Sequence, residues 1–385
     1  MDRVVTIALI LVAGITPRAI AQDSASFVTR LGTDTLVVER FVRSRDRLAA
    51  EVVMRVPVTN RIRYVLELSP AGEMTRLETV AASPPRRDVI TRAGDSLRVE
   101  VTDTGPARVR MVAADRAVLP FLDMVHWPFE LVLTRLKASG ASQTAQPLLS
   151  GQRVASFAVA VVGPDSMTIT HPTRGTMRVR VDAAGRLLAL DAGATTRKLV
   201  VERVGWRAVD LDAVARAWSA QDAAGRRFGA LSGRRIDTAT VAGATIIVDH
   251  GTPAKRGRAI WGALVPFGQV WRTGANEATH FTTDRDLVIG SGTRTLTVPA
   301  GSYTLFSIPE ANGGVLIVSR DTGQAGTAYN AARDLGRVPL ETRALTEPVE
   351  VFTLALTPDG AGGAIRLQWD RSELIARFTV APRPE

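Results

Sequence analysis

The feature that most constrains the fold is a two-residue alternation of apolar and polar side chains between about Phe27 and Val204. The alternating segments are Val52–Val56, Ile62–Leu68, Leu97–Val101, Phe157–Val161 and Met177–Val181. A period of two places side chains on alternate faces of a strand, so each segment predicts a strand with one buried face. Short turn sequences separate the segments. The pattern therefore predicts an antiparallel meander, curved into an open sheet or half-barrel.

One stretch interrupts this pattern with helical spacing of its apolar residues, at about residues 117–137. Pro120 and Pro128 fall where a first helical turn tolerates proline. We predict a helical insertion here, and a loop from Ala138 to Gly151, which is rich in Ser, Gly, Ala and Gln. Two roles for the insertion stay open. The helix completes the core of the curved sheet, or the sheet holds an apolar chain in the manner of an envelope protein.

A second change of period marks the domain boundary. Leu211, Val214, Ala215 and Trp218 share one helical face, and glycines follow them. Strand patterns then return with Gly and Pro turns, which favours a β-sandwich or small barrel. We predict a mainly β protein with an N-terminal antiparallel β domain (22–208), a connecting helix and linker (209–235) and a C-terminal β domain (236–385).

The N-terminus has the pattern of a secretory signal. Met1–Arg3 precede the apolar run Val4–Ile15, and Ala19–Ala21 supply small residues before Gln22. We predict a cleaved signal peptide (1–21) and a periplasmic or extracellular location. The run is shorter than the roughly 20 residues of a spanning helix, so no transmembrane segment is expected. The chain has no cysteine, which excludes disulfides, thiolate metal sites, a cysteine nucleophile and a thioether lipid anchor.

The formal net charge of +10 comes from arginines spread along the strands rather than from basic clusters. Such a distribution is typical of a solvated outer face, so we predict no nucleic-acid partner. Weak contact with anionic envelope surfaces stays an alternative, and the oligomeric state is open. The sequence has no P-loop, no His-Glu-x-x-His, no Gly-x-Ser-x-Gly and no Gly-x-Gly-x-x-Gly. No cofactor is expected.

The segment Lys255–Pro309 concentrates aromatics, glycines and unusual polar residues. Most of it is explained by turns and aromatic packing, but a small set of side chains is not, and it supplies guanidinium, amide, carboxylate and imidazole groups. Arginine and amide donors above an aromatic ring can hold a small polar or anionic ligand. The candidate ligand-binding residues are Arg258, Trp271, Arg272, Asn276, Glu277 and His280.

Two alternatives use the same residues. In the first, the protein is a hydrolase in which Glu277 and His280 act as an acid–base pair or as metal ligands, and Arg272 stabilises negative charge. In the second, the segment is purely structural, with Arg272 paired to Glu277 and His280 an ordinary strand residue. We favour a binding protein without a resident metal, and whether the protein is an enzyme stays open.

Four motifs in this part of the chain occur in order: HGTPAKRGRAIWGALVPFGQVWRTGANEATHFTT, PAGSYTLFSIP, TAYNAARDLGRV and IRLQWD. They resemble the bacterial family known as domain of unknown function 2911, over residues of about 240–380. The family name implies no activity. No family resemblance is found in the N-terminal half.

Overall fold

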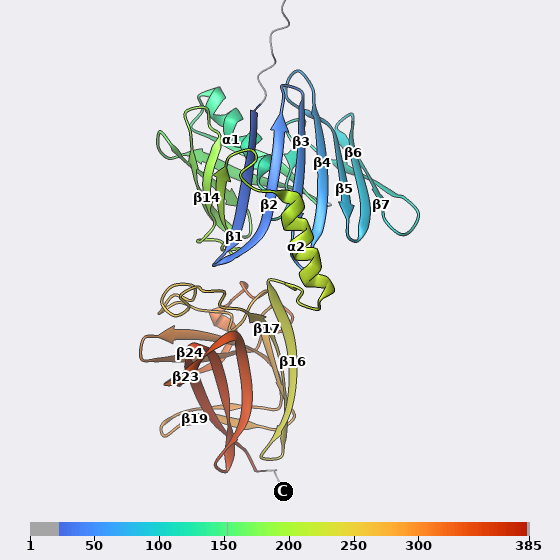
Figure 1. The fold of residues 1–385 in the computed structure, drawn as a ribbon. Coiled ribbons are helices and arrows are strands. Elements are labelled where there is room, and N and C mark those ends of the chain that lie inside the picture. Colours follow the sequence, from blue (N-terminus) through green and yellow to red (C-terminus); the bar gives the residue numbers. More distant parts are fainter. Residues whose placement is uncertain (1–22, 152, 383–385) are drawn as a thin grey trace, which may run out of the picture.

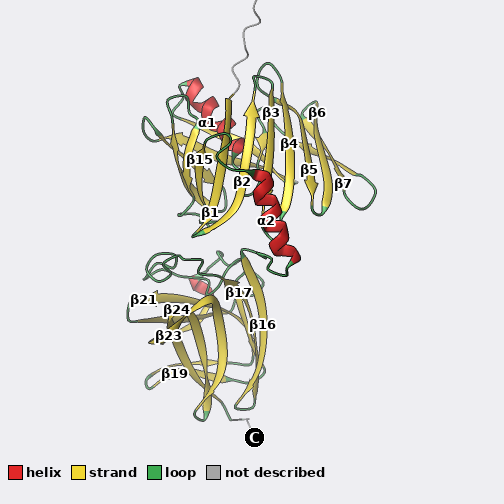
Figure 2. Ribbon diagram, viewed as in Figure 1, coloured by secondary structure: helices red, strands yellow, loops and turns green. Residues whose placement is uncertain are grey.

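The computed structural model describes residues 23–151 and 153–382, which form two β domains arranged end to end (Figures 1 and 2). The fold is mainly β, as the sequence predicts, with one large antiparallel sheet and a second sheet in the C-terminal part. The predicted signal peptide lies outside the described residues. Within the described ranges, no helix is long and apolar enough to cross a membrane.

The N-terminal sheet has fifteen strands in the order β8-β7-β6-β5-β4-β3-β2-β1-β15-β14-β13-β12-β11-β10-β9. They are β1 Asp23–Leu31, β2 Asp34–Arg43, β3 Arg47–Met54, β4 Asn60–Leu68, β5 Met74–Ala82, β6 Pro85–Ala93, β7 Ser96–Thr102, β8 Arg108–Ala113, β9 Leu119–Pro120, β10 Gln143–Ser150, β11 Arg153–Val161, β12 Ser166–His171, β13 Gly175–Val181, β14 Leu187–Asp191 and β15 Val200–Val204. Nearly every strand pairs with its chain neighbours, which confirms the meander. The pairing of β1 with β15 joins the two wings of the sheet, which are strands β1–β8 and strands β9–β15.

Helix α1 (Trp127–Ser139) fills the inside of this sheet. Its Trp127 and Leu133 are fully buried and share one apolar core with residues of both wings, such as Phe41 and Phe157. The space left beside Phe129 measures about 40 Å³. That pocket holds a few water molecules but no acyl chain, and the helix forms part of the core of the curved sheet. A larger space of about 460 Å³ lies beside the helix, next to Leu131 and Arg135.

Helix α1 begins later than the predicted helical stretch 117–137. The buried carboxylate of Glu39 on β2 accepts hydrogen bonds from the backbone N–H groups of His126 (2.9 Å) and Trp127 (3.1 Å). An anion at this place satisfies free N–H groups of the first turn and is favoured by the helix dipole. Upstream, Leu119–Pro120 forms β9, which pairs in parallel with β10. A side chain distant in the sequence thus sets the start of the helix.

The predicted loop from Ala138 to Gly151 is wrong for most of its length, because Gln143–Ser150 forms β10. This strand pairs with β11 over all eight residues. Leu148 and Leu149 are buried in the core. Gln143, Thr144 and Ala145 are exposed at the start of the strand, where pairing with β11 outweighs local preference.

Helix α2 (Leu211–Ala223) packs on the opposite face of β1–β3, as seen in Figure 1. Leu211 and Trp218 form a small apolar cluster with Val28 and Val38 of the sheet. The Asp210 carboxylate caps the helix by accepting a hydrogen bond from the N–H of Ala213 at 3.0 Å. These central strands are therefore buried on both faces.

The C-terminal sheet has nine strands in the order β16-β17-β18-β21-β22-β23-β24-β19-β20 and is not closed. They are β16 Ser232–Val241, β17 Ala244–Pro253, β18 Thr279–Thr283, β19 Leu287–Ser291, β20 Arg294–Val298, β21 Gly301–Glu310, β22 Gly313–Ser319, β23 Asp334–Asp359 and β24 Gly362–Val380, with a 3-10 turn at Ala331–Arg333. The sheet curls around one apolar core.

Two strands of this sheet, β23 and β24, are much longer than the others. The stretches Ile365–Trp369 and Ile375–Val380 lie in the single strand β24, with a positive φ of 53° at Asp370 between them. The first part of β23 pairs with β22 and the remainder with β24. One strand thereby connects two halves of the sheet, which local sequence patterns do not indicate.

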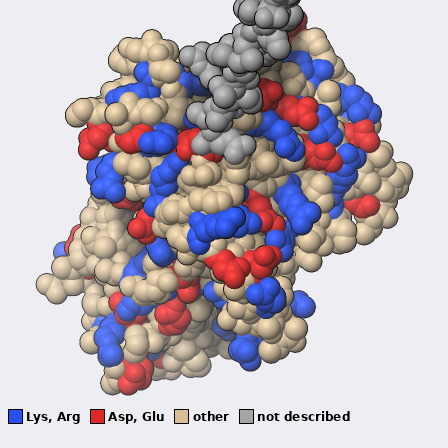
Figure 3. All heavy atoms as spheres, turned by 45° about the horizontal axis from the view of Figure 1, so that its top comes forward, with Lys and Arg blue, Asp and Glu red and all other residues tan. Residues whose placement is uncertain are grey.

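Many arginines of the outer sheet faces pair with acidic residues on nearby strands or on helix α2. Arg61 contacts Glu51 and Asp212, and Glu78 accepts from both Arg76 and Arg87. Positive and negative side chains accordingly intermingle over the face shown in Figure 3. Exposed pairs of this kind contribute little stability, about 0–1 kcal/mol each.

The two domains meet at the turn between β1 and β2. The carbonyl oxygen of Arg256 accepts a hydrogen bond from the N–H of Thr33 (3.2 Å), and its guanidinium pairs with Asp34 (2.9 Å). The same guanidinium lies over the ring of Phe228, 4.1 Å from its centroid. Gly32 has φ +59°, and any Cβ there would overlap the Arg256 carbonyl oxygen. Glycine is therefore required for this close approach.

Candidate functional site

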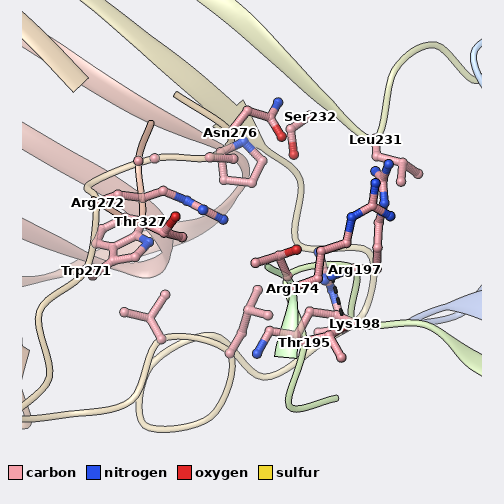
Figure 4. A pocket seen from close by; sticks show the side chains of 18 of the residues that line it. Arg174, Thr195, Arg197, Lys198, Leu231, Ser232, Trp271, Arg272, Asn276 and Thr327 are labelled. Atoms are coloured by element: carbon pink, nitrogen blue, oxygen red, sulfur yellow. Dashed lines mark hydrogen bonds between the residues drawn. The ribbon is translucent and has the colours of Figure 1, made fainter. Parts of the chain in front are cut away.

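A cavity of about 440 Å³ lies between the two domains (Figure 4). The N-terminal domain contributes Arg174 and the β14–β15 connection at residues 194–198. The C-terminal domain contributes the start of β16 and parts of the loops at residues 258–276 and 326–329. A cavity of this size at a domain interface is typical of sites for small molecules.

The loop from Trp271 to Asn276 forms one wall, and its backbone is strained. Thr273 has φ 54° and Asn276 has φ 64°. The left-handed region costs a non-glycine residue about 1–2 kcal/mol, and a β-branched residue such as threonine is rare there. Buried hydrogen bonds hold the conformation: the Thr273 hydroxyl contacts that of Ser307 (2.9 Å), and Thr279 donates to the Thr273 carbonyl oxygen (2.7 Å). Strain of this kind is frequent at ligand-binding sites.

Trp271 is fixed by an aromatic cluster. Its ring stacks on Trp369 at 6.0 Å and 17°, and meets Phe352 edge-on at 5.0 Å. The Trp261 ring contacts it at 5.9 Å and donates its indole N–H to the Trp369 carbonyl oxygen (3.1 Å). The backbone of Trp271 exchanges hydrogen bonds with that of Ser307. The cavity therefore has a rigid apolar wall.

Arg272 extends from this wall into the cavity (Figure 4). Its Nε is buried and has no hydrogen-bond partner, and among the described residues no carboxylate forms an ion pair with its guanidinium. Burial lowers the pKa of Arg272. Its aliphatic part packs on Gly326, where a Cβ would overlap the Arg272 Cδ. The site thus holds a positive charge that lacks a counter-ion within the described chain.

Two more cations in the lining lack a carboxylate contact within the described chain. Arg258 donates to the carbonyl oxygens of Lys255 (2.9 Å) and Ala254 (2.6 Å). Lys198, on the other domain, donates to the carbonyl oxygen of Gly193 at 2.8 Å. Burial, followed by the nearby charges of Arg258 and Arg272, lowers the pKa of Lys198. Cations from both domains therefore repel one another across the cavity.

The remaining lining cations are Arg174 and Arg197, which share the single carboxylate of Asp123. Arg174 Nη1 lies 2.8 Å from Asp123 Oδ1, and Arg197 contacts the other oxygen. Five of the described lining residues are thus cationic, and none of them is acidic. The electrostatic character of the cavity is strongly positive, which favours an anionic ligand.

Four of the six predicted ligand-binding residues line this cavity: Arg258, Trp271, Arg272 and Asn276. Glu277 and His280 are not among the lining residues. Glu277 is exposed, and the His280 Nε2 accepts a hydrogen bond from the N–H of Gly323 at 2.8 Å. His280 also pairs with Asp249 in the β17–β18 register.

The structural alternative predicted an ion pair between Arg272 and Glu277, and none forms between these described residues. Its other prediction agrees with the structure, because His280 lies in β18 with its Nε2 hydrogen-bonded to Gly323. The hydrolase alternative required Arg272, Glu277 and His280 in one cleft, whereas only Arg272 lines the cavity. The nearby His250 is buried, and its Nε2 lies 3.6 Å from an Asp237 carboxylate oxygen without a hydrogen bond. Across the described ranges, no group of three or more His, Asp or Glu side chains could hold a metal ion.

The sequence interpretation missed the N-terminal half of the site. Lys198, Arg197 and Arg174 lie at least about 70 residues before the Trp271 loop, and no spacing rule connects such distant segments. The sequence contained one weak indication of Lys198 as a site residue, because it is one of only three lysines and follows Arg197 directly in a turn sequence.

Comparisons with known proteins identify the C-terminal part alone. Residues 232–378 match the family described as protein of unknown function (DUF2911), which confirms the predicted resemblance for this part. The N-terminal region has no family match. A search of curated proteins found no match.

Two solved structures show low similarity. A DUF1089 family protein from Pseudomonas aeruginosa is 11% identical, covers 49% of this chain and 95% of its own, and has a TM-score of 0.28. A Nitrosomonas europaea protein provisionally described as AttH is 8% identical, with coverages of 96% and 98% and a TM-score of 0.12. TM-scores this low do not indicate a shared fold.

Proposed function

We propose that the protein binds a small anionic ligand in the cavity between its two domains. The location we propose is the periplasm or the extracellular space, on the basis of the signal-like sequence at residues 1–21; N-terminal sequencing of the mature protein tests it by whether the chain begins at Gln22. Binding through this cavity needs no catalytic group, which agrees with the absence of Glu277 and His280 from the lining.

The observation that carries this proposal is the guanidinium of Arg272. Arg272 is partly buried, and a guanidinium N–H that is removed from water without a hydrogen-bond partner is costly. The Arg272 Nε is buried without a hydrogen bond, and the side chain points into the cavity of about 440 Å³. An anion there would accept charge-assisted hydrogen bonds in the bidentate geometry that guanidinium groups favour.

The neighbouring groups support the same ligand class. Lys198 and Arg258 add positive charge, and the Asn276 amide lies on the same wall. The apolar side of the cavity, which includes Trp271 and Val265, suits a carbon skeleton attached to the anion. A mixture of apolar wall and few polar anchors is typical of small-molecule sites.

Calorimetric titration with phenyl phosphate tests the proposal. We expect Arg272→Met to weaken binding at least about tenfold, because a lost charge-assisted hydrogen bond is worth about 1.5–3 kcal/mol. Arg294→Met is the matched control, since Arg294 is exposed at the start of β20 and does not line the cavity. Equal affinity of the Arg272 variant and the wild type, or no binding by the wild type, would contradict the proposal.

A further inference from the structure

We infer that the ligand is a dianion of the phosphate-monoester type, carried on an apolar or aromatic body and held by both domains at once. This inference rests on the proposed function and adds the charge and shape of the ligand. It depends on where the unpaired cations lie, and on what each of them already contacts.

The unpaired cations come from two different walls. Arg258 and Arg272 belong to the C-terminal domain, and Lys198 belongs to the β14–β15 connection of the N-terminal domain. Lys198 adopts φ 57°, a left-handed conformation that lysine rarely takes. Its ammonium keeps one contact, with the Gly193 carbonyl oxygen, and has further donors free for a ligand. A group that satisfies Lys198 and Arg272 together must bridge the domains.

The balance of charge in the cavity indicates more than one negative charge on the ligand. Arg174 and Arg197 already share Asp123, so they are partly neutralised. Lys198, Arg258 and Arg272 have no carboxylate contact among the described residues. Asp191 offsets part of the charge of Lys198, and Glu350 and Asp34 offset part of that of Arg258, but with a monoanion bound the lining would still carry an excess of positive charge. A dianion offsets more of that excess, and the effect is strong in a partly dehydrated site.

The shape of the cavity favours an ester over the free inorganic ion. Its volume of about 440 Å³ is far larger than one tetrahedral anion requires. Trp271, Val265 and Phe306 provide apolar lining on the C-terminal side, and Figure 4 shows Trp271 beside Arg272. A phosphate on Arg272 and Lys198 would leave its organic substituent against these side chains, where burial of apolar area adds affinity.

Phenyl phosphate and phenyl sulfate provide a matched test, because they have nearly the same shape and differ by one charge. At about pH 8 the phosphate monoester carries two charges, since its second pKa is about 6. We expect the wild type to bind phenyl phosphate at least about tenfold more tightly than phenyl sulfate. In Lys198→Met we expect the affinity ratio of phenyl phosphate to phenyl sulfate to fall to about twofold, and Lys198→Arg should restore most of that ratio.

The outcomes separate this inference from the proposed function. If the wild type binds both esters equally while Arg272→Met weakens both, the cavity binds anions but does not select a dianion, and only the inference fails. If inorganic phosphate binds as tightly as phenyl phosphate, the inference that the ligand carries an apolar or aromatic body is wrong. If Arg272→Met changes neither affinity, the proposed function fails. Thermal melting of each variant verifies folding, and Arg294→Met is again the control.

Discussion

Two partly buried arginines, one in each domain, differ in whether a carboxylate pairs with them. In the N-terminal core, Arg203 of β15 donates to Glu130 of α1 at 2.8 Å and contacts Asp23 at 3.3 Å. Its guanidinium also lies 5.7 Å from the ring centroid of Phe27. In the C-terminal domain, Arg272 makes no ion pair with a described residue and points into a cavity.

The difference separates a structural charge from a charge available to a ligand. Glu130 is fully buried, and burial raises its pKa although Arg203 opposes that shift. The pair is an internal unit that joins α1 to the sheet. Burial lowers the pKa of Arg272, and no carboxylate of the described residues pairs with it. The partners of a buried arginine, rather than its burial, thus indicate its role.

The largest expected effect comes from Arg203→Met. It leaves the Glu130 carboxylate buried without its cation, so the free energy of unfolding should fall by about 3–5 kcal/mol. Arg272→Met removes a charge that has no partner, so the ligand-free protein should lose no more than about 0.5 kcal/mol. Urea unfolding of both variants measures the contrast. Equal destabilisation would show that Arg272 has a structural role like that of Arg203.

A smaller effect is expected from Gly326→Ala. The added Cβ would overlap Arg272 Cδ and lie 2.6 Å from the carbonyl oxygen of Asn276. Such crowding costs about 1–3 kcal/mol and should displace the guanidinium, weakening phenyl phosphate binding several-fold. Gly205→Ala is the matched control, because its Cβ would lie 3.9 Å from the nearest atom. If Gly326→Ala leaves the affinity unchanged, the position of Arg272 does not control binding.

The smallest expected effect concerns pH. Burial and the charges of Arg258 and Arg272 lower the pKa of Lys198, so it loses its proton below the ordinary lysine value of about 10.4. Phenyl phosphate affinity should therefore fall a few-fold as the pH rises from about 8 to about 10. Over the same window the ligand-free protein should gain slight stability, because the unfolded chain retains more protons than the folded one.

Lys198→Met provides the comparison for this titration, since it should remove both trends. Calorimetric affinity and urea unfolding across the pH range measure them. A wild type and a variant with identical pH profiles would exclude Lys198 as a ligand contact, while the stability contrast between Arg203 and Arg272 would be unaffected.

The sequence predicted those features that depend on near neighbours in the chain. Alternation such as that of Ile62–Leu68 determined the strands and the meander, because a strand's period is local. The dense segment around Trp271 also contained the four predicted ligand-binding residues that line the cavity. Its unusual composition reflects a strained loop, a packed aromatic and an unpaired arginine in close succession.

Only the tertiary structure decided which side chains meet. The start of α1 depends on Glu39 from β2, and β10 exists because β11 lies beside it. Likewise, the cavity needs Lys198 from one domain opposite Arg272 from the other, and Glu277 is excluded although it follows Asn276 directly. Chain folding brings together residues that no local pattern relates, because long-range packing rather than spacing determines their distance.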